Sequence, residues 1–184
     1  LVGISDKEGY LHDENGLDIA YIKDKRINED LSLKKIDSQK FQSGSVFELA
    51  CDIALPCATQ NELNEDHLRL LVQQGCTIIA EGANRPLTEN AVAILQELDV
   101  YYVPGKAANA GGVAVSGLEM SQNAQKTVFS FAEVDSKLQE IMATIYKEIK
   151  EASLELNNPF HFVKGANYVS YQRLLSAMVL QGLV

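Results

Sequence analysis

The chain has 184 residues, of which 46% are hydrophobic and 22% charged, a globular composition that excludes a disordered or collagen-like chain. The formal net charge is -9 and no long basic run is present, which excludes a protein that binds nucleic acid through its phosphates. No apolar run approaches the ~20 residues that span a bilayer and no signal peptide is visible, so we expect no membrane partner. The sequence opens on Leu1-Val2-Gly3-Ile4, a pattern typical of the inside of a strand, and we expect a piece of a longer protein.

The cysteines indicate a reducing compartment. Cys51, Cys57 and Cys76 are odd in number and form no CxxC pair, so they do not make a disulfide framework. The histidines are scattered along the chain, whereas a tetrahedral zinc site needs clustered ligands. We therefore expect free thiols, no metal site and a cytoplasmic location.

In chain order, the N-terminal quarter predicts short elements separated by turns. Residues 1–5 are expected to form a strand, and residues 10–12 a short extended piece after a turn. Asp18 is expected to cap a helix over residues 19–27. Residues 29–45 are polar and poorly periodic, which predicts a loop with one helical turn.

A regular alternation of strands and helices follows. The elements predicted in order are strand 51–55, a helix capped by Asn64 that ends near residue 74, strand 76–80, a helix over residues 89–98 capped by Thr88, and strand 100–103. Helical crossovers between such short strands imply that the strands are parallel. The strands are apolar nearly throughout, which is typical of a sheet covered on both faces. The expected fold class is therefore α/β, with a doubly wound parallel sheet.

After Pro104 the sequence becomes helical. Helices are predicted over residues 111–125, 133–156 and 168–180. In the second of these, apolar side chains recur every three or four residues, so we expect a long amphipathic helix.

Small and polar residues follow each of the three predicted strands. The clusters are Pro56-Cys57-Ala58-Thr59-Gln60-Asn61, Glu81-Gly82-Ala83-Asn84-Arg85-Pro86 and Pro104-Gly105-Lys106-Ala107-Ala108-Asn109-Ala110-Gly111-Gly112. The carboxyl ends of parallel strands share one edge of the sheet, where ligands bind in α/β folds. Small residues let a flat ligand approach the backbone, and amide side chains offer donors and acceptors. Asn and Gly also make ordinary turns, but three clusters in register favour a ligand-binding edge.

One element of a dinucleotide-binding fold is missing from the sequence. No GxGxxG is present, although this loop normally follows the first strand and holds the cofactor phosphates. Ser5-Asp6 ends the first visible strand, where such folds carry an acidic residue that binds ribose. In the alternative interpretation Asp6 only starts a turn. We expect a Rossmann-like sheet truncated at its first β-α unit and followed by C-terminal helices.

The three clusters resemble the hexameric glutamate dehydrogenase family, which groups enzymes for glutamate, leucine, phenylalanine and valine. The resemblance is carried by residues 51–61 and 81–86 and by the longest run, Pro104 to Asn123. Weaker similarity extends over the whole chain, but only to the nucleotide-binding half of the family's polypeptide. The resemblance implies a truncated dinucleotide-binding domain over residues 1–125. It also implies a C-terminal helical segment over residues 126–184 that packs on this domain and on an absent N-terminal domain.

The resemblance implies roles for individual residues. The cofactor-binding residues would be Ser5, Asp6, Ala58, Thr59, Asn61, Gly82, Ala83, Asn84 and Asn109. Ser5 and Asp6 would lie by the adenosine ribose, and the others by the nicotinamide and its ribose. Val113 and Ser116 would face the amino-acid substrate, with Ser116 hydrogen-bonding the distal carboxylate of glutamate. Relatives that act on leucine, phenylalanine or valine place an apolar residue there. The Ser5-Asp6 ending favours NADP over NAD, although an Asp also suits the free 2′-hydroxyl of NAD.

The implied reaction is the reversible oxidative deamination of L-glutamate to 2-oxoglutarate and ammonia, by an enzyme that is a hexamer at full length. The family's catalytic Lys and Asp lie in the N-terminal domain and have no counterpart in this sequence. We therefore expect no catalytic residue in this chain and no activity from it alone. Two alternatives stay open: a sister dehydrogenase for leucine, phenylalanine or valine, against which Ser116 argues, and a non-catalytic assembly or regulatory module.

Overall fold

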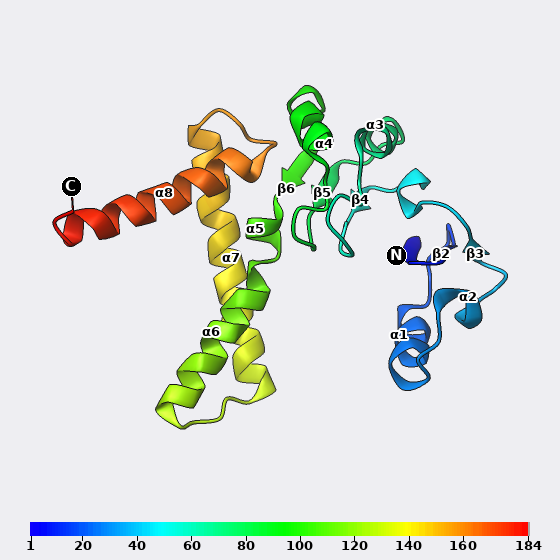
Figure 1. Ribbon diagram of the computed structural model, residues 1–184, viewed down its shortest axis with the longest axis horizontal. Helices are drawn as coiled ribbons and strands as arrows, with labels where there is room; N and C mark the ends of the chain where they lie inside the picture. The colour runs from blue at the N-terminus through cyan, green and yellow to red at the C-terminus, as the bar shows by residue number, and fades with distance from the viewer. Residues whose placement is uncertain (184) are drawn as a thin grey trace.

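The computed structural model describes residues 1–183, except for the side chain of Gln96. Val184, with which the expected C-terminal segment ends, lies outside the described residues. Three parts follow one another across Figure 1: a small N-terminal unit, a parallel sheet with helices, and a group of C-terminal helices.

The N-terminal unit is a three-stranded antiparallel sheet with two helices. The strands are β1 (Gly3–Asp6), β2 (Gly9–His12) and β3 (Phe41–Gln42), and the helices are α1 (Ile19–Asn28) and α2 (Leu33–Ile36). The Asp18 side chain caps α1 by accepting a hydrogen bond from Tyr21 N, as predicted, and α2 is the single helical turn expected between residues 29 and 45. The buried core of this unit consists of Leu11, Leu17, Ile22, Leu33 and Ile36.

The first strand belongs to this antiparallel sheet and not to the parallel one. β1 and β2 are joined by the two residues Lys7 and Glu8, and Ser5 lies opposite Tyr10 in the hairpin register. Asp6 Oδ1 accepts a 2.9 Å hydrogen bond from Glu8 N inside the turn. Such a short connection can join only antiparallel neighbours, so the extended piece at residues 10–12 pairs with the strand before it.

The central part has the strand and helix alternation that the sequence predicts. The elements are η1 (Val46–Glu48), β4 (Ile53–Ala54), α3 (Glu65–Gln73), β5 (Ile78–Ala80), α4 (Glu89–Ile94), η2 (Leu95–Glu97) and β6 (Tyr101–Val103). β5 pairs in parallel with both β4 and β6, which confirms the α/β fold class. The side chains of Asn64 and Thr88 cap α3 and α4, as predicted, by accepting hydrogen bonds from backbone N–H groups in the first turn of each helix.

The two faces of the parallel sheet differ in burial. Ala54, Ile79 and Tyr102 share one face and are buried in a core with α3 and α4. On the other face, Ile53 is 52% exposed and Tyr101 is 45% exposed. The expectation that both faces are covered is therefore wrong for the residues that the structure describes. The physical reason is that two successive crossovers in the same direction put both helices on one face.

The C-terminal part consists of α5 (Gly105–Ala108), α6 (Ala110–Gln125), α7 (Phe131–Glu155) and α8 (Phe162–Leu180). The short helix α5 was not predicted, and α8 begins well before its predicted start at residue 168. Gly165 lies in this added part of α8 and packs so closely on Ser153 of α7 that a Cβ would collide with the serine hydroxyl. The glycine thus serves helix packing and does not interrupt the helix. None of the helices within residues 1–183 is long and apolar enough to cross a membrane.

The beginning of α8 is attached to the sheet. Tyr102 N donates a 2.8 Å hydrogen bond to Phe160 O, and Tyr102 forms a parallel bridge with His161. The connection between α7 and α8 therefore lies along β6, as Figure 1 shows.

Candidate functional site

The loops that follow β4 and β5 are held against each other, as the three-cluster prediction requires. Gly82 N and Ala83 N donate to Pro56 O at 3.0 and 3.1 Å. Asn61 N donates to Arg85 O at 3.0 Å. Asn61 and Arg85 both have left-handed backbones, with φ of 58° and 53°, a conformation that Asn tolerates better than most residues. The first two clusters therefore form one continuous edge.

The second and third clusters are joined by an amide side chain. Asn109 Nδ2 donates to Ala83 O at 3.1 Å and to Asn84 Oδ1 at 2.9 Å. Both amide hydrogens of Asn109 are used in this way, which leaves its Oδ1 to accept from a ligand. The Asn84 side chain is exposed and takes part in this bond through Oδ1, which leaves its Nδ2 group to donate to a ligand.

The edge is open and lined by small residues. Ala58, Thr59, Asn61 and Gly82 are exposed. A Cβ at Gly82 would collide with Cys57 Sγ, so a larger residue there would push the two loops apart. The predicted cofactor residues of β4, β5 and β6 thus meet at one accessible surface with amide donors and acceptors, which suits a flat ligand such as a nicotinamide ring.

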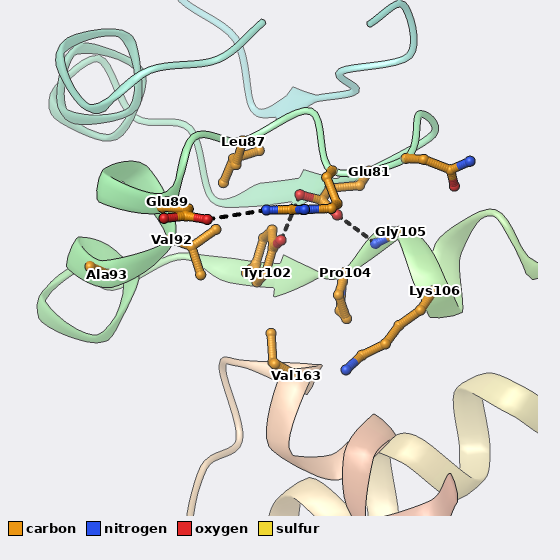
Figure 2. A pocket seen from close by; sticks show the side chains of 12 residues that line it. Glu81, Leu87, Glu89, Val92, Ala93, Tyr102, Pro104, Gly105, Lys106 and Val163 are labelled. Carbon is orange, nitrogen blue, oxygen red and sulfur yellow. Dashed lines mark hydrogen bonds and ion pairs between the residues drawn. The ribbon is translucent and has the colours of Figure 1, made fainter. Parts of the chain in front are cut away.

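A buried carboxylate, which the sequence did not single out, lies beneath this edge. Glu81 is 5% exposed, and its Oε1 accepts a 2.6 Å hydrogen bond from the Tyr102 hydroxyl. Glu81 Oε2 accepts another, also 2.6 Å long, from Gly105 N (Figure 2). Burial, together with the neighbouring carboxylate, raises the pKa of Tyr102, so its hydroxyl remains the donor. The signal in the sequence was a carboxylate placed directly after an apolar strand.

A cavity of about 740 Å³ opens beside Glu81 and Tyr102, between α4, the end of β6 and the start of α8 (Figure 2). Its walls include Val92 from α4 and Val163 from α8. Lys106 extends along the cavity and donates to Asn167 Oδ1 of α8. Burial lowers the pKa of Lys106. This lysine therefore connects α5 to α8.

Ser5 and Asp6 lie elsewhere, on β1 of the antiparallel sheet. Ser5 is exposed. Asp6 Oδ2 accepts a 3.0 Å hydrogen bond from Leu33 N and lies 3.6 Å from a guanidinium nitrogen of Arg26. Burial alone would raise the pKa of Asp6, but the hydrogen bonds from Leu33 and Glu8 and the charge of Arg26 outweigh it and lower the pKa. The partners of the Asp6 carboxylate thus all lie in the N-terminal unit, and Asp6 does not lie at the edge formed by the ends of β4, β5 and β6.

Val113 and Ser116 lie one helical turn apart on α6, which begins immediately after Asn109. Val113 is 74% exposed, and Ser116 Oγ donates to Gly112 O at 3.2 Å. The single hydroxyl hydrogen of Ser116 is thus engaged within the helix, and it must turn away from Gly112 O before it can be donated to an acceptor outside the helix. In the part of the chain that the structure describes, no group of three His, Cys, Asp or Glu side chains could hold a metal ion.

Comparison with known proteins gives a consistent result along the whole chain. Residues 1–182 match the family model described as Glutamate/Leucine/Phenylalanine/Valine dehydrogenase. A glutamate dehydrogenase of Bacteroides thetaiotaomicron is 43% identical over 193 aligned positions, which cover 100% of this chain and 43% of that protein. An NAD(P)-specific glutamate dehydrogenase of Xylanibacter ruminicola is 38% identical, with coverage of 99% of this chain and 43% of that protein. Other curated relatives are named NADP-specific or NAD-specific.

The fold agrees with solved structures of the same kind. The structure of Plasmodium falciparum glutamate dehydrogenase 2 superposes with a TM-score of 0.88 at 38% identity, covering 100% of this chain and 42% of that one. The chain thus spans less than half the length of the relatives that it matches.

Proposed function

Since the chain belongs to the Glutamate/Leucine/Phenylalanine/Valine dehydrogenase family, we propose that it is the cofactor-binding half of a glutamate dehydrogenase. In this proposal the complete enzyme is an oxidoreductase that converts L-glutamate to 2-oxoglutarate and ammonia, reversibly, with NAD or NADP. The observation that carries the proposal is the pairing of Asn84 and Asn109 at an open, small-residue edge of a parallel sheet. Ligands bind at this edge in α/β folds.

The residues at the edge fit a nicotinamide. The carboxamide group of the ring has both a donor and an acceptor, and the Asn109 Oδ1 and Asn84 Nδ2 groups are complementary to them. Ala58, Thr59, Asn61, Gly82 and Ala83 would border the ring and its ribose. When bound, the nicotinamide supplies the hydride acceptor, and the part played by this chain is to orient the ring.

The substrate would be selected on α6. Val113 and Ser116 would face the amino-acid side chain. The Ser116 hydroxyl would turn from Gly112 O and donate its hydrogen to the distal carboxylate of glutamate. A hydroxyl at this position favours glutamate over apolar amino acids, because only glutamate offers a distal carboxylate that the hydroxyl can bind.

The choice between NADP and NAD depends on the N-terminal unit. Ser5 and Asp6 would lie by the adenosine ribose, and we propose NADP as the cofactor, with NAD as the alternative. The exposed Ser5 hydroxyl supports NADP, because it can donate to a 2′-phosphate. The Asp6 carboxylate, which is paired with Arg26, suits the free 2′-hydroxyl of NAD and keeps NAD as the alternative.

The chain would be organised as two parts of a larger enzyme. Residues 1–125 would form the truncated dinucleotide-binding domain, and residues 126–184 the helical segment that packs on it and on an N-terminal catalytic domain. The complete enzyme would be a cytoplasmic homohexamer. No catalytic residue is assigned to this chain, so the chain alone would be inactive.

The test compares the chain alone with the full-length gene product. The full-length protein is expected to reduce NADP or NAD in the presence of L-glutamate, and the isolated chain to reduce neither. Assays with L-leucine, L-phenylalanine and L-valine cover the sister activities. Turnover of one of these in preference to glutamate, or no turnover of any of them, would contradict the proposal.

A further inference from the structure

We propose that Glu81 is a positioning residue, which holds the Asn84–Asn109 pair in the orientation that the nicotinamide needs. This inference rests on the proposed function, but it concerns a residue that touches neither cofactor nor substrate. Figure 2 shows Glu81 in the interior, between Tyr102 on β6 and Gly105 at the start of α5.

Both carboxylate oxygens of Glu81 are engaged. The Tyr102 hydroxyl and Gly105 N each donate at 2.6 Å, so the side chain connects the end of β5 to the end of β6. Glu81 N also donates to Val103 O at 3.1 Å, which adds a backbone connection between the same strands. Hydrogen bonds from buried neutral donors to a carboxylate are strong, and this geometry therefore fixes where α5 begins.

The start of α5 determines where Asn109 lies. Gly105 is the first residue of α5, and Asn109 N donates to Gly105 O at 2.9 Å at the end of the same short helix. Asn109 then reaches back to Ala83 and Asn84, two and three residues after Glu81. The carboxylate and the amide pair thus belong to one closed ring of contacts between the ends of β5 and β6.

The ring is tightly packed around Gly105. A Cβ there would lie 2.8 Å from Ala83 O and 3.1 Å from both Glu81 Oε2 and Asn109 Nδ2. Because there is no room for even a methyl group, a small displacement of the Glu81 carboxylate is transmitted to Asn109.

The test uses kinetics of the full-length protein with L-glutamate and with L-glutamate deuterated at Cα. Removal of the carboxylate in Glu81→Ala leaves Tyr102 and Gly105 without their acceptor and is expected to lower kcat about tenfold to a hundredfold, because a misoriented ring slows hydride transfer. The deuterium isotope effect on kcat is expected to rise, since the chemical step becomes slower, while KM for the cofactor changes less than kcat.

Conservative variants separate positioning from stability. Glu81→Gln can still accept from Gly105 N and donate to the Tyr102 oxygen, so it is expected to restore kcat to within about threefold of wild type. Tyr102→Phe removes one donor and should give an intermediate loss in kcat with a raised isotope effect. The matched control is Tyr10→Phe, which removes a buried tyrosine hydroxyl that donates to Gln42 Oε1 at 3.0 Å in the N-terminal sheet. It is expected to leave the isotope effect unchanged.

The outcomes distinguish the two proposals. If wild-type protein shows no glutamate-dependent activity, the proposed function fails. If wild type is active but Tyr102→Phe lowers only the melting temperature, as Tyr10→Phe does, the positioning role of Glu81 is wrong. Equal losses in Glu81→Gln and Glu81→Ala would also overturn it, because the negative charge and not the position of the side chain would then be what matters.

Discussion

Asn109 and Asn84, which come from the ends of different strands, share a 2.9 Å hydrogen bond in which Asn109 is the donor. The direction of this bond makes the two amides unequal. Asn109 uses both hydrogens of Nδ2 on acceptors from the loop after β5, whereas Asn84 accepts through Oδ1 and keeps Nδ2 for a ligand.

This asymmetry predicts different effects of the same substitution at the two positions. Asn109→Asp replaces a donor by an oxygen that faces Ala83 O and Asn84 Oδ1, and unfavourable contacts of this kind cost about 1–3 kcal/mol. Asn84→Asp keeps the acceptor that Asn109 needs. We expect Asn109→Asp to lower the melting temperature of the full-length protein and to weaken NADPH binding at least tenfold. Asn84→Asp should weaken binding with little effect on melting.

Fluorescence titration with NADPH and thermal unfolding measure the two effects. Equal melting temperatures for the two variants would contradict the donor assignment at Asn109.

Ser116 is predicted to determine substrate selectivity. Ser116→Val removes the hydroxyl proposed to bind the distal carboxylate, so kcat/KM for glutamate should fall about a hundredfold relative to leucine. The matched control is Ser170→Ala on α8, because Ser170 Oγ donates to the carbonyl of Ala166 one turn earlier, as Ser116 Oγ does to Gly112. An unchanged preference for glutamate in Ser116→Val would show that Ser116 does not determine selectivity.

The lowered pKa of Asp6 predicts that the stability of the folded protein depends on pH. Its pKa is lowered in the folded protein, so the carboxylate stabilises the fold at pH values above its unfolded pKa of about 3.9. This stabilisation is lost as the pH falls through the folded pKa. At pH 7 Asp6→Asn should destabilise the N-terminal unit by about 1.5–3 kcal/mol, because one hydrogen bond to a charged acceptor is lost.

The difference in melting temperature between Asp6→Asn and wild type should therefore shrink below about pH 4. Asp24→Asn serves as the control, since Asp24 is exposed and accepts a hydrogen bond from Asn28 within the same helix α1. A difference that is independent of pH would contradict the role of the Asp6 charge.

The crossing of α7 and α8 depends on Gly165. A Cβ at this position would collide with Ser153 Oγ and lie 2.6 Å from Ile149 O, so Gly165→Ala should force the helices apart and cost about 1–3 kcal/mol. Gly117→Ala on α6 is the control, because a Cβ there meets nothing within 4 Å. That substitution should stabilise the helix by about 0.5–1 kcal/mol. Thermal unfolding of both variants checks the contrast, and a stable Gly165→Ala protein would contradict it.

Much of the fold and part of the site could be predicted from the sequence, for identifiable reasons. The caps at Asp18, Asn64 and Thr88 are local, and each depends on a side chain and a backbone N–H three residues later. The meeting of the three clusters followed from the topology of parallel strands, which needs no knowledge of side-chain packing.

The features that were missed depend on contacts between distant residues. The role of Glu81 requires Tyr102 and Gly105, 21 and 24 positions away, and its place directly after an apolar strand does not by itself show that it is buried. The early start of α8 requires the contact between Gly165 and Ser153, which turns a helix-breaking residue into a packing residue. The exposed face at Ile53 depends on which side the crossover helices pack, and the apolar pattern of the strands does not specify this.

The backbone contacts of Phe160 and His161 with Tyr102 also protect the edge of the parallel sheet from pairing with another chain. β6 is the last strand in the order β4-β5-β6, and an edge strand with free N–H groups is a template for pairing with another chain. Because the Tyr102 N–H already donates to the carbonyl of Phe160, that position on β6 cannot recruit a strand from a second molecule. The connection between α7 and α8 thereby opposes aggregation through strand pairing at this edge.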